Sequence, residues 1–255
     1  MDPTKNYTML IESPVPLSER QRVASELMRI ESCVEQVGYI SEKSGCDIDL
    51  QMAGGEFCGN ASMSAAAFFA YSNGISVGDV HLFVSGCEDQ ISVGVSKYSD
   101  GAYKCTVGMP KHRDIIKVCF NGENMPAVVF DGITHLIIEN KQIDKNKAES
   151  IIPVLCKKLR AEALGMMFTD TERQTLTPLV FVPSAKTMYW ENSCASGTAA
   201  VGIYYSHLRN KQITLSLLQP GGTLSVKTAP GGTPRLSGDV RFCKKNTITL
   251  DSILF

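Results

Sequence analysis

The amino-acid sequence predicts an α+β protein built from two similar halves. Two segments resemble each other: Gly-Gly-Glu-Phe-Cys-Gly-Asn-Ala-Ser around Cys58, and Trp-Glu-Asn-Ser-Cys-Ala-Ser-Gly-Thr around Cys194. Each is followed by a run of small and apolar residues typical of a buried helix, and then by two short strand-like runs separated by a glycine-containing turn. The same order of cysteine, helix, strand, turn and strand occurs twice, which indicates a twofold repeat.

Local signals place the elements of each half. Asn73-Gly74 and Asn210 stop the two buried helices, and two other segments carry apolar residues at helical spacing and are expected to be packing helices. The expected helices are 16–30, 61–71, 147–159 and 197–209, and the expected strands are 81–84, 91–95, 213–218 and 224–226.

The sequence also predicts where one half ends and the other begins. We expect a first half over residues 1–112, a second over 113–245, and a final strand within 246–255 that returns to the first half. No low-complexity tract or flexible linker separates the halves. The active site is therefore expected in the cleft between them.

Composition narrows the classes of function. The 255 residues are 44% hydrophobic and 20% charged, with a formal net charge of -1 and scattered Lys and Arg residues. Neither nucleic acid nor an anionic membrane is an expected partner, so a small molecule is favoured. The N-terminus lacks signal-peptide character, and no apolar run reaches the roughly 18 residues of a membrane span. The nine cysteines include no C-x-x-C pair, which favours free thiols in the cytoplasm over a metal site.

The two cysteines at helix starts suggest proton-transfer chemistry. The positive end of a helix dipole lowers the pKa of a thiol from about 8.5 toward neutrality. Backbone N–H groups at Gly59, Asn60, Ala195 and Ser196 can bind a carboxylate between two helix starts. If one thiolate removes the α-proton of an amino acid and the opposite thiol returns one, the stereocentre inverts without any cofactor or metal.

Structural alternatives exist for each of these residues. A single cysteine at a helix start is most often a small buried residue, and only the matched pair favours function. Cys87, in a hairpin turn, is interpreted as structural. His135 alternates with apolar neighbours on an expected strand, so we interpret it as a satisfied core or edge histidine and not as a base.

At these motifs the chain resembles the diaminopimelate epimerase superfamily of cofactor-independent, two-cysteine racemases and epimerases. Within it, the chain is most similar to the histidine racemases of opine metallophore biosynthesis. The segments that carry this closer resemblance are Cys33–Tyr39, Glu56–Ser64, Val84–Cys87, Leu164–Met167 and Trp190–Cys194. The resemblance implies a β-barrel-like sheet around a central helix in each half, and a homodimer.

The resemblance also implies roles for individual residues. Cys58 and Cys194 would be catalytic. Asn6, Glu35 and Glu191 would bind the substrate together with the residues at the two helix starts, although Glu35 could equally be a solvated acid and Glu191 could simply cap its loop.

Departures from the family patterns bear on the substrate. Diaminopimelate epimerases carry Glu-Arg-Gly before the second cysteine, whereas here Tyr189 and Trp190 occupy that stretch. A distal carboxylate would lose its bidentate arginine partner. The two aromatic rings could instead pack on an imidazole, or could belong to the core. Ala195 replaces the usual glycine after the second cysteine, which could shift the donor loop.

The predicted reaction is the interconversion of L-histidine and D-histidine. The alternatives are a diaminopimelate epimerase, a racemase of another amino acid, and, less favoured, an inactive amino-acid-binding protein.

Overall fold

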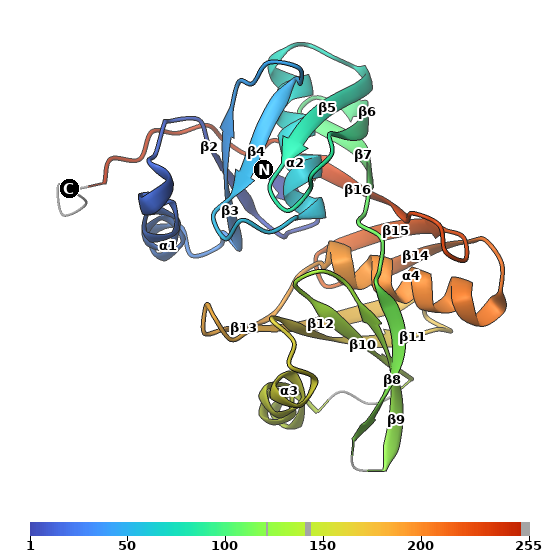
Figure 1. Ribbon diagram of the computed structural model, residues 1–255. Coiled ribbons are helices and arrows are strands. Elements are labelled where there is room, and N and C mark those ends of the chain that lie inside the picture. The colour runs from blue at the N-terminus through green and yellow to red at the C-terminus, as the bar shows by residue number, and fades with distance from the viewer. Residues whose placement is uncertain (121, 141–143, 251–255) are drawn as a thin grey trace. The chain divides into compact units, whose positions relative to one another are not determined.

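The computed structural model describes residues 1–120, 122–140 and 144–250. These form two compact units, Met1–Val107 together with the chain from Asp239 onward, and Gly108–Gly238 (Figure 1). The chain returns to the first unit at Asp239, earlier than the predicted return at 246.

The first unit contains two parallel strand pairs, each joined by a helix. Strands β2 and β3 are parallel and connected through α1, and β4 and β5 are parallel and connected through α2. Antiparallel strands complete the sheet in the order β2-β3-β4-β5-β6-β7. The elements are β1 (Asp2–Pro3), β2 (Thr8–Ile11), η1 (Leu17–Glu19), α1 (Arg20–Ile30), β3 (Gln36–Ser41), β4 (Ile48–Met52), α2 (Gly59–Ser72), β5 (Val77–Val84), β6 (Ile91–Ser99) and β7 (Ala102–Gly108).

The second unit repeats this arrangement. Strands β10 and β11 are parallel and connected through α3, and β12 and β14 are parallel and connected through α4. The elements are β8 (Asp114–Phe120), β9 (Glu123–Val129), β10 (Thr134–Glu139), α3 (Lys145–Leu159), β11 (Leu164–Asp170), β12 (Thr175–Val182), β13 (Thr187–Trp190), α4 (Ala195–Arg209), β14 (Ile213–Gln219), β15 (Gly222–Thr228) and β16 (Arg235–Arg241). The twofold repeat expected from the sequence is confirmed.

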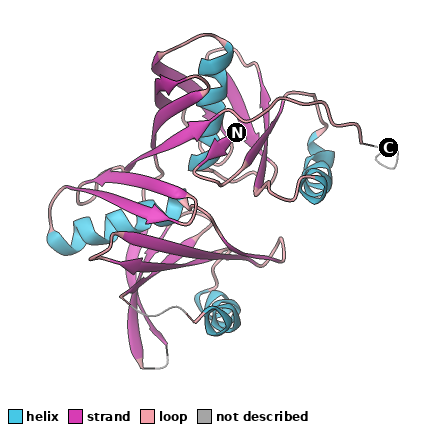
Figure 2. Cartoon of the chain, turned by 180° about the vertical axis from the view of Figure 1, so that it is seen from behind, coloured by secondary structure: helices cyan, strands magenta, loops and turns pink. Residues whose placement is uncertain are grey.

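The helices that follow the two cysteines are the central helices of their units. Helix α2 contacts the strands β1 to β6, and α4 contacts β9, β10, β11, β14 and β15 (Figure 2). Small residues allow this, because a helix enclosed by strands must be apolar all round and must let backbones approach. At Gly202 a Cβ would lie 2.6 Å from Val226 Cγ1, so only glycine fits between α4 and β15.

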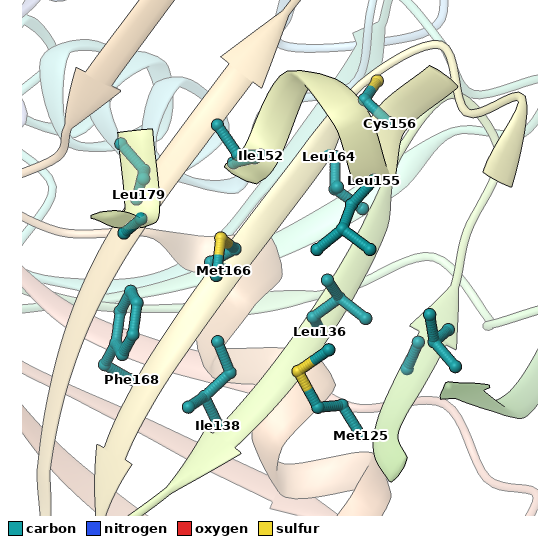
Figure 3. Packing of buried hydrophobic residues seen from close by; sticks show 13 residues of the cluster. Met125, Leu136, Ile138, Ile152, Leu155, Cys156, Leu164, Met166, Phe168 and Leu179 are labelled. Carbon is teal, nitrogen blue, oxygen red and sulfur yellow. The ribbon is translucent and has the colours of Figure 1, made fainter. Parts of the chain in front are cut away.

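The other two helices each cover one outer surface. Helix α3 places Ile152 and Leu155 against Leu136 and Leu164, all fully buried or nearly so (Figure 3). Truncating one of these side chains to alanine would cost about 2–5 kcal/mol. Helix α1 packs Ala24 on β3 in the same way within the first unit.

The helix expected over 16–30 begins with the 3₁₀ turn Leu17–Glu19 before α1. The final strand expected within 246–255 is not formed over 246–250, and 251–255 lie outside the described residues. Over the part of the chain that is described, no helix combines the length and apolarity needed to cross a membrane.

Candidate active site

Both cysteines cap a central helix in the same way. Cys58 has extended backbone angles (φ -131°, ψ 114°), and its Sγ accepts a hydrogen bond from Ala61 N at 3.4 Å. Cys194 is nearly superposable in geometry (φ -122°, ψ 111°), and its Sγ accepts from Gly197 N at 3.4 Å. Each sulfur thus lies at the positive end of its helix, where free N–H groups favour negative charge.

A chain of polar side chains leads to Cys58. The Cys58 thiol donates to Gln36 Oε1 at 2.8 Å, and Gln36 Nε2 donates to Asn6 Oδ1 at 2.6 Å and to Thr8 Oγ1 at 2.7 Å. Asn6 Nδ2 in turn donates to Glu35 Oε2 at 2.7 Å. The structure therefore brings the predicted site residues Asn6 and Glu35 into one network with Cys58, through Gln36.

Different partners surround Cys194. Its backbone N–H donates to Gln219 Oε1 at 2.9 Å, and Gln219 Nε2 donates to Thr198 Oγ1 at 2.8 Å, which fixes the loop from the end of β14. Ser196 Oγ lies 3.6 Å from the Cys194 sulfur, and His135 Nε2 lies 2.9 Å from Ser196 Oγ. A buried histidine therefore reaches the cysteine loop through one hydroxyl group.

Burial changes the protonation expected of Cys194. The side chain is 5% exposed, and burial raises the pKa of its thiol well above the usual value. The Glu191 carboxylate raises the pKa further through its charge and a hydrogen bond, while Gly197 N–H and Ser196 act in the opposite direction. The lowered pKa expected from the sequence is wrong for Cys194, because desolvation outweighs the helix dipole. The resting group is a thiol whose proton faces a carboxylate.

His135 is fully buried on β10, as expected for a core histidine, but its hydrogen bonding is not satisfied as predicted, because Nδ1 is buried without a hydrogen-bond partner among the described residues. Burial lowers its pKa to about 3, so the imidazole is neutral at physiological pH. Its room is made by Gly165, the residue opposite it on β11, where a Cβ would lie 2.2 Å from His135 Nδ1. The sequence interpretation missed its contact with Ser196, since strand alternation says only that the ring points inward.

The remaining predicted residues lie in the first turns of the two helices. Gly59 and Asn60 open α2 and are buried, and Ala195 and Ser196 open α4, with Ala195 5% exposed. Their backbone N–H groups belong to the first turn, which has no partners within its own helix. Their role as carboxylate donors stays a prediction.

The aromatic residues before Cys194 divide into two environments. Trp190 stacks on Phe168 with ring centroids 5.7 Å apart, donates from Nε1 to Glu149 Oε1 at 2.6 Å, and has Lys145 Nζ 4.9 Å from its ring centroid. Packing within the second unit accounts for Trp190, which favours the core alternative over substrate stacking. Tyr189 is 53% exposed on β13.

Gln36 is the network member that sequence reasoning did not select. It lies within the segment Cys33–Tyr39, directly after Glu35, and opens strand β3. A polar residue at the start of a strand carries little signal by itself. Its pairing with Thr8 across the parallel strands β2 and β3 requires the fold.

The fold defined by two such repeats is the diaminopimelate epimerase-like fold. A structure of a PhzF-family phenazine biosynthesis protein from Bacillus anthracis has a TM-score of 0.67 and 11% identity, covering 97% of this chain and 95% of its own. A predicted epimerase from Pseudomonas aeruginosa has a TM-score of 0.66 and 11% identity, covering 96% and 98%. At these identities the likeness concerns the fold alone.

Sequence similarity is more specific than the fold. Residues 1–233 match the family model described as the histidine racemase CntK N-terminal domain. A histidine racemase from Staphylococcus aureus is 32% identical over 239 residues, covering 88% of this chain and 85% of its own. The chain belongs to the histidine racemase family.

Proposed function

We propose that this protein is an amino-acid racemase that inverts the α-carbon of histidine with two cysteine thiols and no cofactor. One observation carries the proposal: the two repeats each present a cysteine sulfur as the cap of their central helix, with an N–H group 3.4 Å away. Racemisation by two bases needs one proton carrier on each face of the reacting carbon, since product and substrate are mirror images there.

The proposed reaction transfers one proton in and one proton out. One cysteine, as thiolate, removes the α-proton, and the C–H electron pair passes to the α-carbon and its carboxylate. The other cysteine, as thiol, then gives its proton to the opposite face. Each turnover leaves the two sulfurs with exchanged protonation states. The reverse reaction restores them, and between turnovers in the same direction proton exchange with water does so.

Glu191 is proposed to make the Cys194 thiolate. The carboxylate faces the resting thiol and raises the pKa of that thiol, and it is proposed to accept the proton when the thiolate forms. The first-turn N–H groups then offer direct stabilisation to the sulfur, as Gly197 N already does.

The developing negative charge is proposed to rest on the substrate carboxylate held by first-turn N–H groups. Gly59 and Asn60 supply donors from α2, and Ala195 and Ser196 supply donors from α4. A preorganised donor of this kind is worth about 2.7–4 kcal/mol in the transition state. Glu35 is proposed to pair with the α-ammonium or the imidazole ring, and Glu191, while it is ionised, with the α-ammonium.

The chemistry of the site argues against two other functions, a diaminopimelate epimerase and an inactive binding protein. A diaminopimelate epimerase would need a cation for the distal carboxylate, and the segment before Cys194 carries no arginine. An inactive binding protein would have no use for two capped thiols. Histidine is favoured by family membership, and its D-isomer is proposed as a precursor for an opine metallophore.

The proposal also includes the cellular compartment and the partners of the protein. All nine cysteines are free, which fits a reducing compartment, and we propose the cytoplasm. The substrate is a small molecule, and a homodimer is proposed from the resemblance to the superfamily.

Hydrogen exchange in deuterated water tests the function. Dialysed protein is incubated with L-histidine, L-alanine or L,L-diaminopimelate. The products are separated by chiral chromatography, and their deuterium content is measured by mass spectrometry. We expect D-histidine with one α-deuterium, and slower or no exchange for the other two. Unlabelled histidine would identify a binding protein, and preferred exchange of diaminopimelate would identify the epimerase.

A further inference from the structure

The hydrogen bonds around Cys58 have a defined polarity that begins at Glu35. An ionised carboxylate can only accept hydrogen bonds, so the Asn6 amide must turn its NH₂ group toward Glu35 Oε2, 2.7 Å away. The carbonyl oxygen of Asn6 must then face the other way. It meets Gln36 Nε2 at 2.6 Å.

Thr8 fixes the Gln36 amide independently. The Thr8 hydroxyl donates to the backbone oxygen of Asn6 at 3.2 Å, which leaves its lone pairs for Gln36 Nε2 at 2.7 Å. Thr8 and Gln36 are opposite each other in the parallel pair of β2 and β3, so the contact is built into the strand register. Both NH₂ protons of Gln36 are committed, and its carbonyl oxygen can point only toward Cys58.

We infer that Gln36 is a positioning residue that holds Cys58 as a thiol with its S–H directed at the Gln36 amide oxygen, 2.8 Å away. A carbonyl oxygen stabilises the thiol and repels a thiolate at the same distance. It also cannot take the proton, since an amide is not a base at physiological pH. Gln36 therefore favours the protonated form of Cys58 and cannot itself remove the proton.

Two of the residues that orient Gln36 are buried. Thr8 is 1% exposed and Asn6 is 5% exposed, which limits the access of water to the bonds that they make with the Gln36 amide. The N–H of Ala61 approaches a lone pair of the same sulfur and is compatible with a thiol. If the proposed function holds, the acceptor of the Cys58 proton is the α-carbanion, and Cys58 is the proton donor of the resting enzyme.

Alkylation of Cys58 tests the inference without substrate. The intact protein is treated with iodoacetamide at several pH values between about 6 and 10, and alkylation of the Cys58 peptide is followed by mass spectrometry. Gln36→Met, which keeps the size of the side chain, should react about threefold to tenfold faster at a given pH, because the bond that favours the thiol is lost. Gln36→Glu should react more slowly than the wild type, because a carboxylate disfavours the thiolate further.

The matched control is Gln51→Met on the neighbouring strand β4, where Gln51 Nε2 bonds to Asp49 and not to a cysteine. It should leave the Cys58 curve unchanged. Superimposed curves for the wild type, Gln36→Met and Gln36→Glu would overturn the inference. Because the readout needs no turnover, absence of deuterium exchange in the wild type would remove the proposed function while leaving the alkylation result intact.

Discussion

The two cysteines have the same backbone geometry and opposite surroundings. Both cap a central helix, but the Cys58 thiol faces an amide oxygen of Gln36, whereas the Cys194 thiol faces the carboxylate of Glu191. The amide oxygen accepts the S–H of Cys58, and the carboxylate raises the pKa of Cys194. The repeat thus sets where each sulfur lies, and the neighbouring side chains set what each sulfur does with its proton.

Strand register shows where the two repeats diverge. In the first unit Thr8 is opposite Gln36, and in the second the corresponding pair of strands places Thr134 opposite Leu164. His135, one position further along β10, corresponds by register to Met9 on β2. The polar side chain that reaches the cysteine loop therefore comes from β3 in the first unit, where Gln36 bonds Cys58, and from β10, the counterpart of β2, in the second, where His135 bonds Ser196.

Removal of either sulfur should have the largest effect. Cys58→Ala and Cys194→Ala should each lower histidine racemisation by about 10²- to 10⁴-fold, because a proton carrier acting in the transition state contributes that much. Chiral chromatography measures the loss, and circular dichroism checks that the fold persists. Full turnover in either variant would show that the pair of sulfurs is not the pair of proton carriers.

Glu191→Gln should have the next largest effect on turnover, and it should change the reactivity of Cys194 but not that of Cys58. The carboxylate raises the pKa of Cys194, so its removal lowers that pKa, yet turnover should fall by about tenfold to a hundredfold because the proton acceptor is lost. Rates of turnover and of Cys194 alkylation should move in opposite directions, while Cys58 alkylation stays constant. A parallel rise of turnover and Cys194 reactivity would contradict a role for Glu191 as base.

His135 makes the stability of the second unit depend on pH. Its pKa is about 3 in the folded protein against an ordinary value of 6.5, so below pH 6.5 the unfolded chain binds a proton that the folded chain does not. Stability falls as pH falls, by about 2 kcal/mol between pH 6.5 and pH 5. Urea unfolding should show this loss in the wild type and a flatter dependence in His135→Gln. His207→Gln, at an exposed position, is the control and should behave as the wild type.

Much of this fold can be predicted from the sequence, because it rests on local signals. The runs after Cys58 and Cys194 are small and apolar, and the stops at Asn73 and Asn210 are unambiguous, so the repeat and both helix caps follow directly.

The proton environments could not be predicted in the same way. Gln36 meets Cys58, and His135 meets Ser196, across strands distant in sequence. The pKa of Cys194 depends on how completely it is buried, and no motif reports burial. Sequence patterns therefore predicted the two cysteine sulfurs as the proton carriers, and only tertiary contacts distinguish the surroundings of one sulfur from those of the other.

The smallest expected effect concerns Trp190, in the strand before Cys194. It decides whether the indole ring stacks on the substrate or belongs to the core of the second unit. The indole stacks on Phe168 and donates to Glu149, so its ring is already packed within the unit. Trp190→Phe should lower the free energy of unfolding by about 1–2 kcal/mol through the lost hydrogen bond to a charged group. The KM for histidine should stay within about twofold of the wild type, because no stacking surface for the substrate is removed. Steady-state kinetics with urea unfolding on the same preparation gives both values. A KM that rises while the free energy of unfolding is unchanged would show that Trp190 contacts the substrate. The residues around Cys194 would then determine substrate specificity as well as proton transfer.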